Sequence, residues 1–238
     1  HDDILFRSGD DVAIWFMNGT RVEGSKVFFG VNDYVVRAIG DFNGDGIDDI
    51  AWQRFATDEA AIWLMDSNGN YASSAVYPLM STNTIVAAGD LNGDGKDDLI
   101  IRRGFDDGVN FWLMDGLTID ATAAFQGANH ELQAWGDFDG DGKMDVVLIN
   151  NSNGNCFAYQ NIATGTTFSP TTVLYANNVG DWRIVDAVDF NADLKTDFFW
   201  RNMTSNQTAV WMINGTAAYQ SRLLGTVPAS TSVRAQRS

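Results

Sequence analysis

Four segments of the chain place carboxylate and amide side chains at the odd-numbered positions of a nine-residue pattern. The shared pattern is Asp-x-Asn/Asp-x-Asp, closing on a fourth aspartate at position 9, and its first aspartates lie 49, 47 and 52 residues apart. Calcium takes six to eight oxygen ligands, and a glycine at position 6 permits the sharp turn that brings them together. We therefore predict that side chains at positions 1, 3, 5 and 9 and the carbonyl at position 7 bind Ca²⁺. The predicted metal ligands are Asp41, Asn43, Asp45, Ile47 and Asp49; Asp90, Asn92, Asp94, Lys96 and Asp98; Asp137, Asp139, Asp141, Lys143 and Asp145; and Asp189, Asn191, Asp193, Lys195 and Asp197.

The fourth loop departs from the pattern at one position. Leu194 stands where the first three loops have the turn glycine. A side chain at that position predicts a strained loop or a weaker site. We expect three calcium sites in the first three loops, and leave open whether the fourth binds metal.

EF-hand loops and simple tight turns share parts of this pattern. An EF-hand loop ends in a bidentate glutamate at position 12 and continues into a helix, whereas position 12 here is Trp52, Ile101, Leu148 or Trp200. The Asn-Gly and Asp-Gly pairs are also typical of tight turns. A bare turn, however, does not require three or four carboxylates that repel one another without a cation.

The loops belong to a repeat that runs through the whole chain. A second phrase, such as Ala61-Ile-Trp-Leu-Met-Asp66, recurs five times out of step with the first. Short Val-, Ile-, Phe- and Trp-rich runs alternate with Gly-, Asn- and Asp-rich turns, which predicts strands and no helices. In the second unit we expect strands at 35–39, 50–54, 60–65 and 75–79. Four strands per period of 40–50 residues indicate an all-β fold, a β-propeller with four antiparallel strands per blade.

The two ends of the chain fit one shared blade. Residues 1–7 align with 47–53, and residues 232–236 align with 35–39, an innermost strand. The C-terminal strand would therefore join the N-terminal blade and close the ring, which removes open sheet edges. The prediction is a single domain of five blades: 1–30 plus 230–238, 31–80, 81–128, 129–178 and 179–229.

The phrases resemble a known family. Gly40-Asp-Phe-Asn-Gly-Asp-Gly-Ile-Asp-Asp49 and its copies, with the strand after each, are similar to the FG-GAP/VCBS repeats of integrin-α-like β-propellers. The resemblance covers essentially the whole chain and implies calcium between the first and second strands of a blade. The chain differs in having five blades where integrins have seven, and in Leu194. The family includes lectins, adhesion modules and domains attached to polysaccharide-degrading enzymes, so the resemblance does not fix the function.

The charge balance limits the possible partners. The chain of 238 residues carries 15 Lys and Arg against 31 Asp and Glu, a formal charge of −16. This excludes nucleic acid and anionic membranes as expected partners, since both need a basic surface. The apolar runs are strand-sized, so no membrane insertion is expected. Cys156 is the only cysteine and cannot form an internal disulfide.

The compartment follows from the metal. Millimolar extracellular calcium fills weak loops that micromolar cytosolic calcium leaves empty, so we expect a secreted or cell-surface protein. The chain opens at His1 without a signal-like stretch, and we read it as a mature or excised segment. The sequence does not indicate an oligomeric state.

The aromatic residues and the polar turns suggest a role in binding. In-register tryptophans are expected in the inter-blade core, whereas Trp135 and Trp182 lie outside the repeat and suit a local role. Polar turns at 8–11, 55–59, 104–107, 150–155 and 202–207 should lie opposite the calcium loops and suit hydroxyl-rich ligands. We expect a carbohydrate-binding, lectin-like module for a glycan or another cell-surface ligand. A polysaccharide lyase or hydrolase and a protein-binding adhesion module are the alternatives. No catalytic residues are proposed, and the sequence favours binding over catalysis without deciding the question.

Overall fold

The computed structural model describes residues 4–31, 33–125 and 130–228. Within these residues the chain forms 21 β-strands and no helix, so the all-β prediction is confirmed. No helix that could span a membrane occurs in this part of the chain.

The strands pair in sequence order into antiparallel sheets. The first sheet has three strands, and each of the next four has four strands. A small hairpin, β15–β16, is inserted between the last two strands of the fourth sheet and was not predicted. The sheets are β1 (Ile4–Ser8), β2 (Asp11–Asn18) and β3 (Arg21–Phe28); β4 (Tyr34–Gly40), β5 (Asp49–Arg54), β6 (Glu59–Met65) and β7 (Tyr71–Pro78); β8 (Thr84–Gly89), β9 (Asp98–Arg102), β10 (Val109–Asp115) and β11 (Thr118–Phe125); β12 (His130–Gly136), β13 (Asp145–Asn150), β14 (Cys156–Gln160) and β17 (Thr171–Ala176), with the hairpin β15 (Ala163–Thr164) and β16 (Thr167–Phe168); and β18 (Trp182–Val188), β19 (Asp197–Asn202), β20 (Gln207–Ile213) and β21 (Ala218–Thr226).

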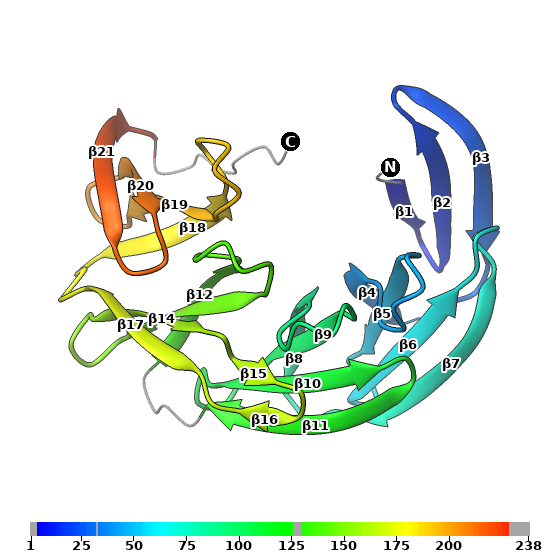
Figure 1. Cartoon of the computed structure of the whole chain (residues 1–238). Coiled ribbons are helices and arrows are strands. Elements are labelled where there is room, and N and C mark those ends of the chain that lie inside the picture. Colours follow the sequence, from blue (N-terminus) through cyan, green and yellow to red (C-terminus); the bar gives the residue numbers. More distant parts are fainter. Residues whose placement is uncertain (1–3, 32, 126–129, 229–238) are drawn as a thin grey trace.

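The sheets follow one another along an arc (Figure 1). In the four-stranded sheets the first strand lies toward the inside of the arc and the last strand lies outside. The inner strands contact each other between neighbouring sheets, as β4 does with β8 and β12 with β18. The first and fifth sheets stand at the two ends of the arc (Figure 1).

The predicted strands of the second unit agree with the observed ones. The first three match within one residue at each end, and the fourth begins at Tyr71 rather than at residue 75. The predicted closing strand, 232–236, lies outside the described residues, so the inner strand of the first sheet stays a prediction.

Aromatic residues fill the space between neighbouring sheets. Trp52 and Trp200 are fully buried, as expected for the inter-sheet core. Trp15, at the same repeat position as Trp63, is 42% exposed instead, contrary to that expectation. Its neighbours Val12 and Ile14 pack toward the second sheet, so Trp15 points to the opposite face of the first sheet, against which no other described sheet packs.

Candidate metal centres

The four aspartate loops occupy equivalent places in four sheets. Each connects the innermost strand to the second strand, and the aspartate at position 9 begins that second strand. The loops therefore lie at the same end of their sheets, as predicted. The first sheet begins with β1, so no such loop occurs in its described part.

The carboxylate at position 1 shapes each loop. In the third loop Asp137 Oδ1 accepts hydrogen bonds from the backbone N–H groups of Gly140 (2.6 Å) and Asp141 (3.2 Å), and Oδ2 accepts one from Gly142 (2.8 Å). Folding the backbone around this side chain puts both glycines in the left-handed region, with φ of 83° and 84°. Glycine adopts this conformation without steric cost.

The position 9 carboxylates are fully buried. Asp145, with no exposed surface, accepts hydrogen bonds from the N–H groups of Phe138 (3.0 Å) and Asn161 (3.1 Å). Burial, reinforced by nearby carboxylates, raises the pKa of Asp49 to about 6, of Asp98 to about 7 and of Asp145 to about 8, although these backbone hydrogen bonds oppose the shift. Each carboxylate oxygen has a second lone pair, so a cation can still bind beside the two N–H groups.

The third loop gathers the most acidic oxygens. Carboxylate oxygens of Asp137, Asp139 and Asp145 lie within 4.8 Å of one another. Asp141 stands apart from this group, and its carboxylate forms an ion pair with the Lys143 ammonium at 3.2 Å. In the other three loops, where asparagine occupies position 3, the described acidic side chains form no comparable group of three.

The fourth loop has the same backbone without the glycines. Ala192 and Leu194 adopt φ of 63° and 67°, and their N–H groups donate to Asp189 as the glycines do in the third loop. The sequence pointed to Leu194 alone. The left-handed conformation of Ala192, at position 4, was not predicted, because only the glycine at position 6 was expected to form the sharp turn.

Neighbouring loops are joined in a row, which the sequence did not reveal. The N–H at position 8 donates to the position 1 carbonyl of the preceding loop: Asp97 to Asp41 and Met144 to Asp90, both at 2.7 Å, and Thr196 to Asp137 at 2.6 Å. The residue before each position 1 aspartate is a glycine. A Cβ at any of these glycines would lie within 2.5 Å of the incoming position 8 side chain, so the sheets approach each other here only because no side chain intervenes. The glycines are Gly40, Gly89 and Gly136.

The loops and the strands that follow them also decide the family. The sequence model of the FG-GAP-like repeat matches residues 41–101 and 137–200, which together make up more than half of the chain. The chain belongs to the FG-GAP-like repeat family. The first matched segment runs from the first aspartate loop into β9, and the second runs from the third loop into β19.

Solved structures with a similar arrangement of strands exist. One is described as a crystal structure of the nidogen/laminin complex, with 10% identity, a TM-score of 0.48 and 92% coverage of both chains. Another is described as the structure of the Dos1 propeller, with 15% identity and a TM-score of 0.48. That match covers 92% of this chain and 54% of the Dos1 chain, so the chain spans about half the length of that protein. No curated protein matches the chain.

Proposed function

We propose that the chain is a calcium-stabilised, five-bladed β-propeller that serves as a glycan-binding module outside the cell. The observation that carries the calcium part is the acidic group of the third loop. Its three carboxylates lie within 4.8 Å of one another, and one of them, Asp145, is fully buried. Like charges this close are unfavourable unless protons or a cation neutralise them.

The donor set suits calcium among the common cations. Carboxylate, amide and carbonyl oxygens are hard ligands, and none of the loops offers a thiolate or imidazole. Asp137, Asp139 and Asp145 would hold the ion of the third loop, with Asp141 joining them after release from Lys143. Asp41, Asn43, Asp45 and Asp49, and their counterparts in the second and fourth loops, would hold the others. Calcium would supply the positive charge that relieves the buried carboxylates.

The five-bladed ring is supported by a backbone hydrogen bond that recurs where the chain leaves the first, second, fourth and fifth sheets. After the outer strand, Val31 N–H donates to Asp10 O, Leu79 to Asp58, and Val179 to Gly154, at 2.7–2.8 Å. The next inner strand begins three to five residues later in each case. Val227 N–H donates to Asn206 O in the same way at 3.0 Å. The same spacing would start an inner strand at 230–232, which agrees with the closing strand proposed from the sequence.

The uncovered face of the first sheet also supports closure. Ile4 and Phe6 are 41% and 40% exposed, whereas their counterparts in the second sheet, Ile50 and Trp52, are 2% and 0% exposed. In a closed ring this face would pack against the fifth sheet.

A cross-link tests the closure directly. The alignment with residues 35–39 places Ala235 opposite Leu5, because Ala38 pairs with Ala51. The double variant Leu5→Cys/Ala235→Cys should form a disulfide on mild oxidation, since opposite residues of antiparallel strands lie within bonding reach. A matched pair one residue out of register, Leu5→Cys/Gln236→Cys, should not, because Gln236 aligns with Ile39, which pairs with Ile50 rather than with Ala51. Equal cross-linking of both pairs, or of neither, would contradict the proposed ring.

Glycan binding is supported by the end of the molecule opposite the metal loops. The polar turns lie there, and Asn and Asp side chains can pair with sugar hydroxyls. The in-register Arg7 and Gln53, however, hold the backbone of the next inner strand, through the carbonyls of Tyr34 and Asn83. They serve the fold, so recognition would fall to other side chains at this end.

The test is a glycan array probed with the full chain in calcium and in EGTA. Binding to at least one glycan class, weakened in EGTA through loss of folded protein, is the expected result. An array without any bound glycan in calcium would overturn the glycan-binding part.

A further inference from the structure

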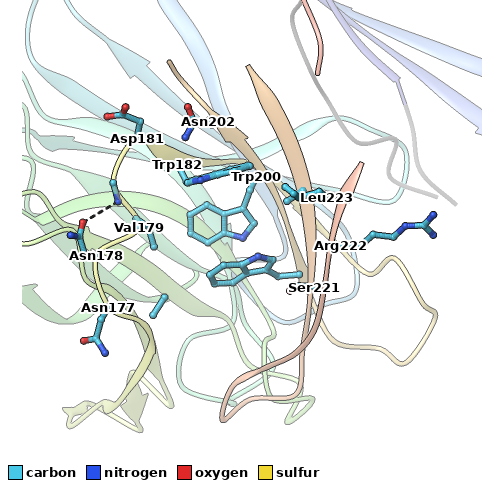
Figure 2. A pocket seen from close by; sticks show the side chains of 14 residues that line it. Asn177, Asn178, Val179, Asp181, Trp182, Trp200, Asn202, Ser221, Arg222 and Leu223 are labelled. Atoms are coloured by element: carbon cyan, nitrogen blue, oxygen red, sulfur yellow. Dashed lines mark hydrogen bonds between the residues drawn. The ribbon is translucent and has the colours of Figure 1, made fainter. Parts of the chain in front are cut away.

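A cavity of about 660 Å³ lies between the fourth and fifth sheets, away from the metal loops. Three tryptophans line it: Trp182 at the start of β18, Trp200 on β19 and Trp211 on β20 (Figure 2). The segment between β17 and β18 forms one wall, and β21 forms another. Its size falls in the range of small-molecule sites, roughly 300–1,000 Å³.

The cavity exists because an aromatic ring is displaced at this one interface. At the preceding interfaces the outer strand places Phe28, Tyr77 or Phe125 against the aromatic residue of the next sheet, with ring centroids 4.9–5.8 Å apart. Those three residues pair across the sheet with Val12, Ala60 and Val109.

In the fourth sheet the residue in this register is Ala176, which pairs with Cys156. A bulge beside it moves Tyr175 onto Phe198, 5.6 Å between centroids, and its hydroxyl donates to Gly215 O. Trp211 therefore has no ring from β17 above it among the described residues. Among the described residues its ring partner is Trp200, with the ring centroids 4.6 Å apart and 46° between the planes.

Polar groups around the cavity are free to bind a ligand. The side chains of Asn177 and Ser221 are exposed and make no hydrogen bond or ion pair with other described residues. Asp181 and Asn202 also line the wall and accept hydrogen bonds from Thr204. The lining therefore combines aromatic faces, unused donors and acceptors, and the negative charge of Asp181.

We infer that this cavity binds a neutral hexopyranose residue of a glycan, an assignment that rests on the proposed glycan-binding function. A pyranose ring presents a C–H face that packs against the indoles of Trp182 and Trp211, which are only partly buried. Its hydroxyl edge requires the donors and acceptors of Asn177 and Ser221. Arg222 pairs with Val210 and points away from the tryptophans (Figure 2), so the negative charge of Asp181 is not offset by a cation among the described residues on this face and disfavours an acidic sugar.

Two substitutions should close the site without touching the metal loops. Ala176→Phe restores the ring found at the other interfaces and fills the space over Trp211. Ser221→Arg adds a long side chain at the exposed edge, opposite Trp211 in β20. Ser74→Arg is the matched control, because Ser74 is exposed and lies opposite Trp63 in the second sheet.

The full chain in millimolar calcium is titrated with methyl β-glucoside, methyl α-mannoside, methyl β-galactoside and the neutral trisaccharides that bind on the array. Tryptophan fluorescence and calorimetry report binding. We expect at least a tenfold loss of affinity in Ala176→Phe and Ser221→Arg, and wild-type affinity in Ser74→Arg. Thermal melts identify any variant that fails to fold, in which case Ser221→Arg alone decides.

The outcomes separate the two proposals. Array binding with unchanged affinity in Ala176→Phe and Ser221→Arg would overturn this site and leave glycan binding standing. Stronger binding to acidic than to neutral sugars would overturn the ligand class. An empty array would overturn the glycan-binding function and the site with it.

Discussion

The third and fourth aspartate loops have the same backbone conformation, but they differ in the strain of that conformation and in the number of carboxylates they bring together. Both wrap around a position 1 carboxylate, Asp137 or Asp189, through the same N–H groups. The third reaches this shape with glycines, whereas the fourth forces Ala192 and Leu194 into the left-handed region. The carboxylate hydrogen bonds therefore determine the loop conformation, and the glycines remove the strain that a Cβ adds, about 1 kcal/mol or more per residue.

The loops differ as well in charge. Asp139 at position 3 completes the close acidic group of the third loop, and Asn191 takes its place in the fourth. A strained loop with fewer carboxylates is the weaker candidate for a cation, although its hydrogen bonds are intact. We therefore expect loop shape and metal affinity to vary independently in this sequence pattern.

Calcium removal should have the largest effect. A site saturated about 100-fold above its Kd stabilises the folded state by about 2.7 kcal/mol, and about 1 kcal/mol shifts the Tm of a domain this size by about 2–4 °C. We expect EGTA to lower the Tm by about 5–10 °C for each occupied site, measured by calorimetry. Superimposable melting curves in calcium and EGTA would refute the metal assignment.

Position 9 substitutions should separate the two loops. Asp145 and Asp197 each accept a hydrogen bond from a buried backbone N–H, that of Phe138 or of Ile213. Asp145→Asn and Asp197→Asn each replace one carboxylate oxygen by an NH₂ group and weaken these bonds, which costs about 1–3 kcal/mol with or without calcium. In calcium, Asp145→Asn should lose the binding energy of its site in addition, whereas Asp197→Asn should lose less. Urea unfolding of both variants in calcium and EGTA measures the difference, and equal calcium-dependent losses would show that the fourth loop binds as well as the third.

Exchanging the turn residues should have a smaller effect of opposite sign in the two loops. Gly142→Leu should destabilise the protein by about 1–2 kcal/mol through left-handed strain. Leu194→Gly should stabilise it by up to about 1 kcal/mol, because relief of strain outweighs the added freedom of the unfolded chain. Both values come from denaturant unfolding in EGTA, so that metal does not contribute. A destabilised Leu194→Gly would mean that the exposed leucine makes contacts that outweigh its strain.

Cys156 should give the smallest signal and report on the interface between the two sheets. It is fully buried in the cluster that joins the fourth and fifth sheets, and burial raises its pKa to about 12. Thiol reagents react with the thiolate, so we expect no labelling at pH 8 in calcium. Labelling that appears in EGTA below the melting temperature would show that the loops hold this interface closed.

The sequence predicted the repeat unit well because its signals are local. The alternation of short apolar runs and turn residues located the strands, and the aspartate spacing located the loops between first and second strands. The displaced ring beside Ala176 could not be predicted, since it depends on a bulge that shifts Tyr175 by one register position. Trp182 was singled out as foreign to the repeat, and it proved to line the cavity. The exposure of Trp15 was not predicted, because the burial of this side chain depends on which sheet packs against the first sheet.

The glycines that precede the loops bear on how such a chain can lengthen. Each unit contributes at one edge a glycine that admits its successor, and at the other edge the backbone N–H that enters its predecessor. Duplication of a whole unit therefore copies both halves of the joint, and the new copy fits on either side without further change. A duplication of one full period restores a complete loop wherever its breakpoints fall, because the glycine and the position 8 N–H recur at the same places in successive loops. Gene rearrangements that change the number of units should accordingly add or remove whole periods.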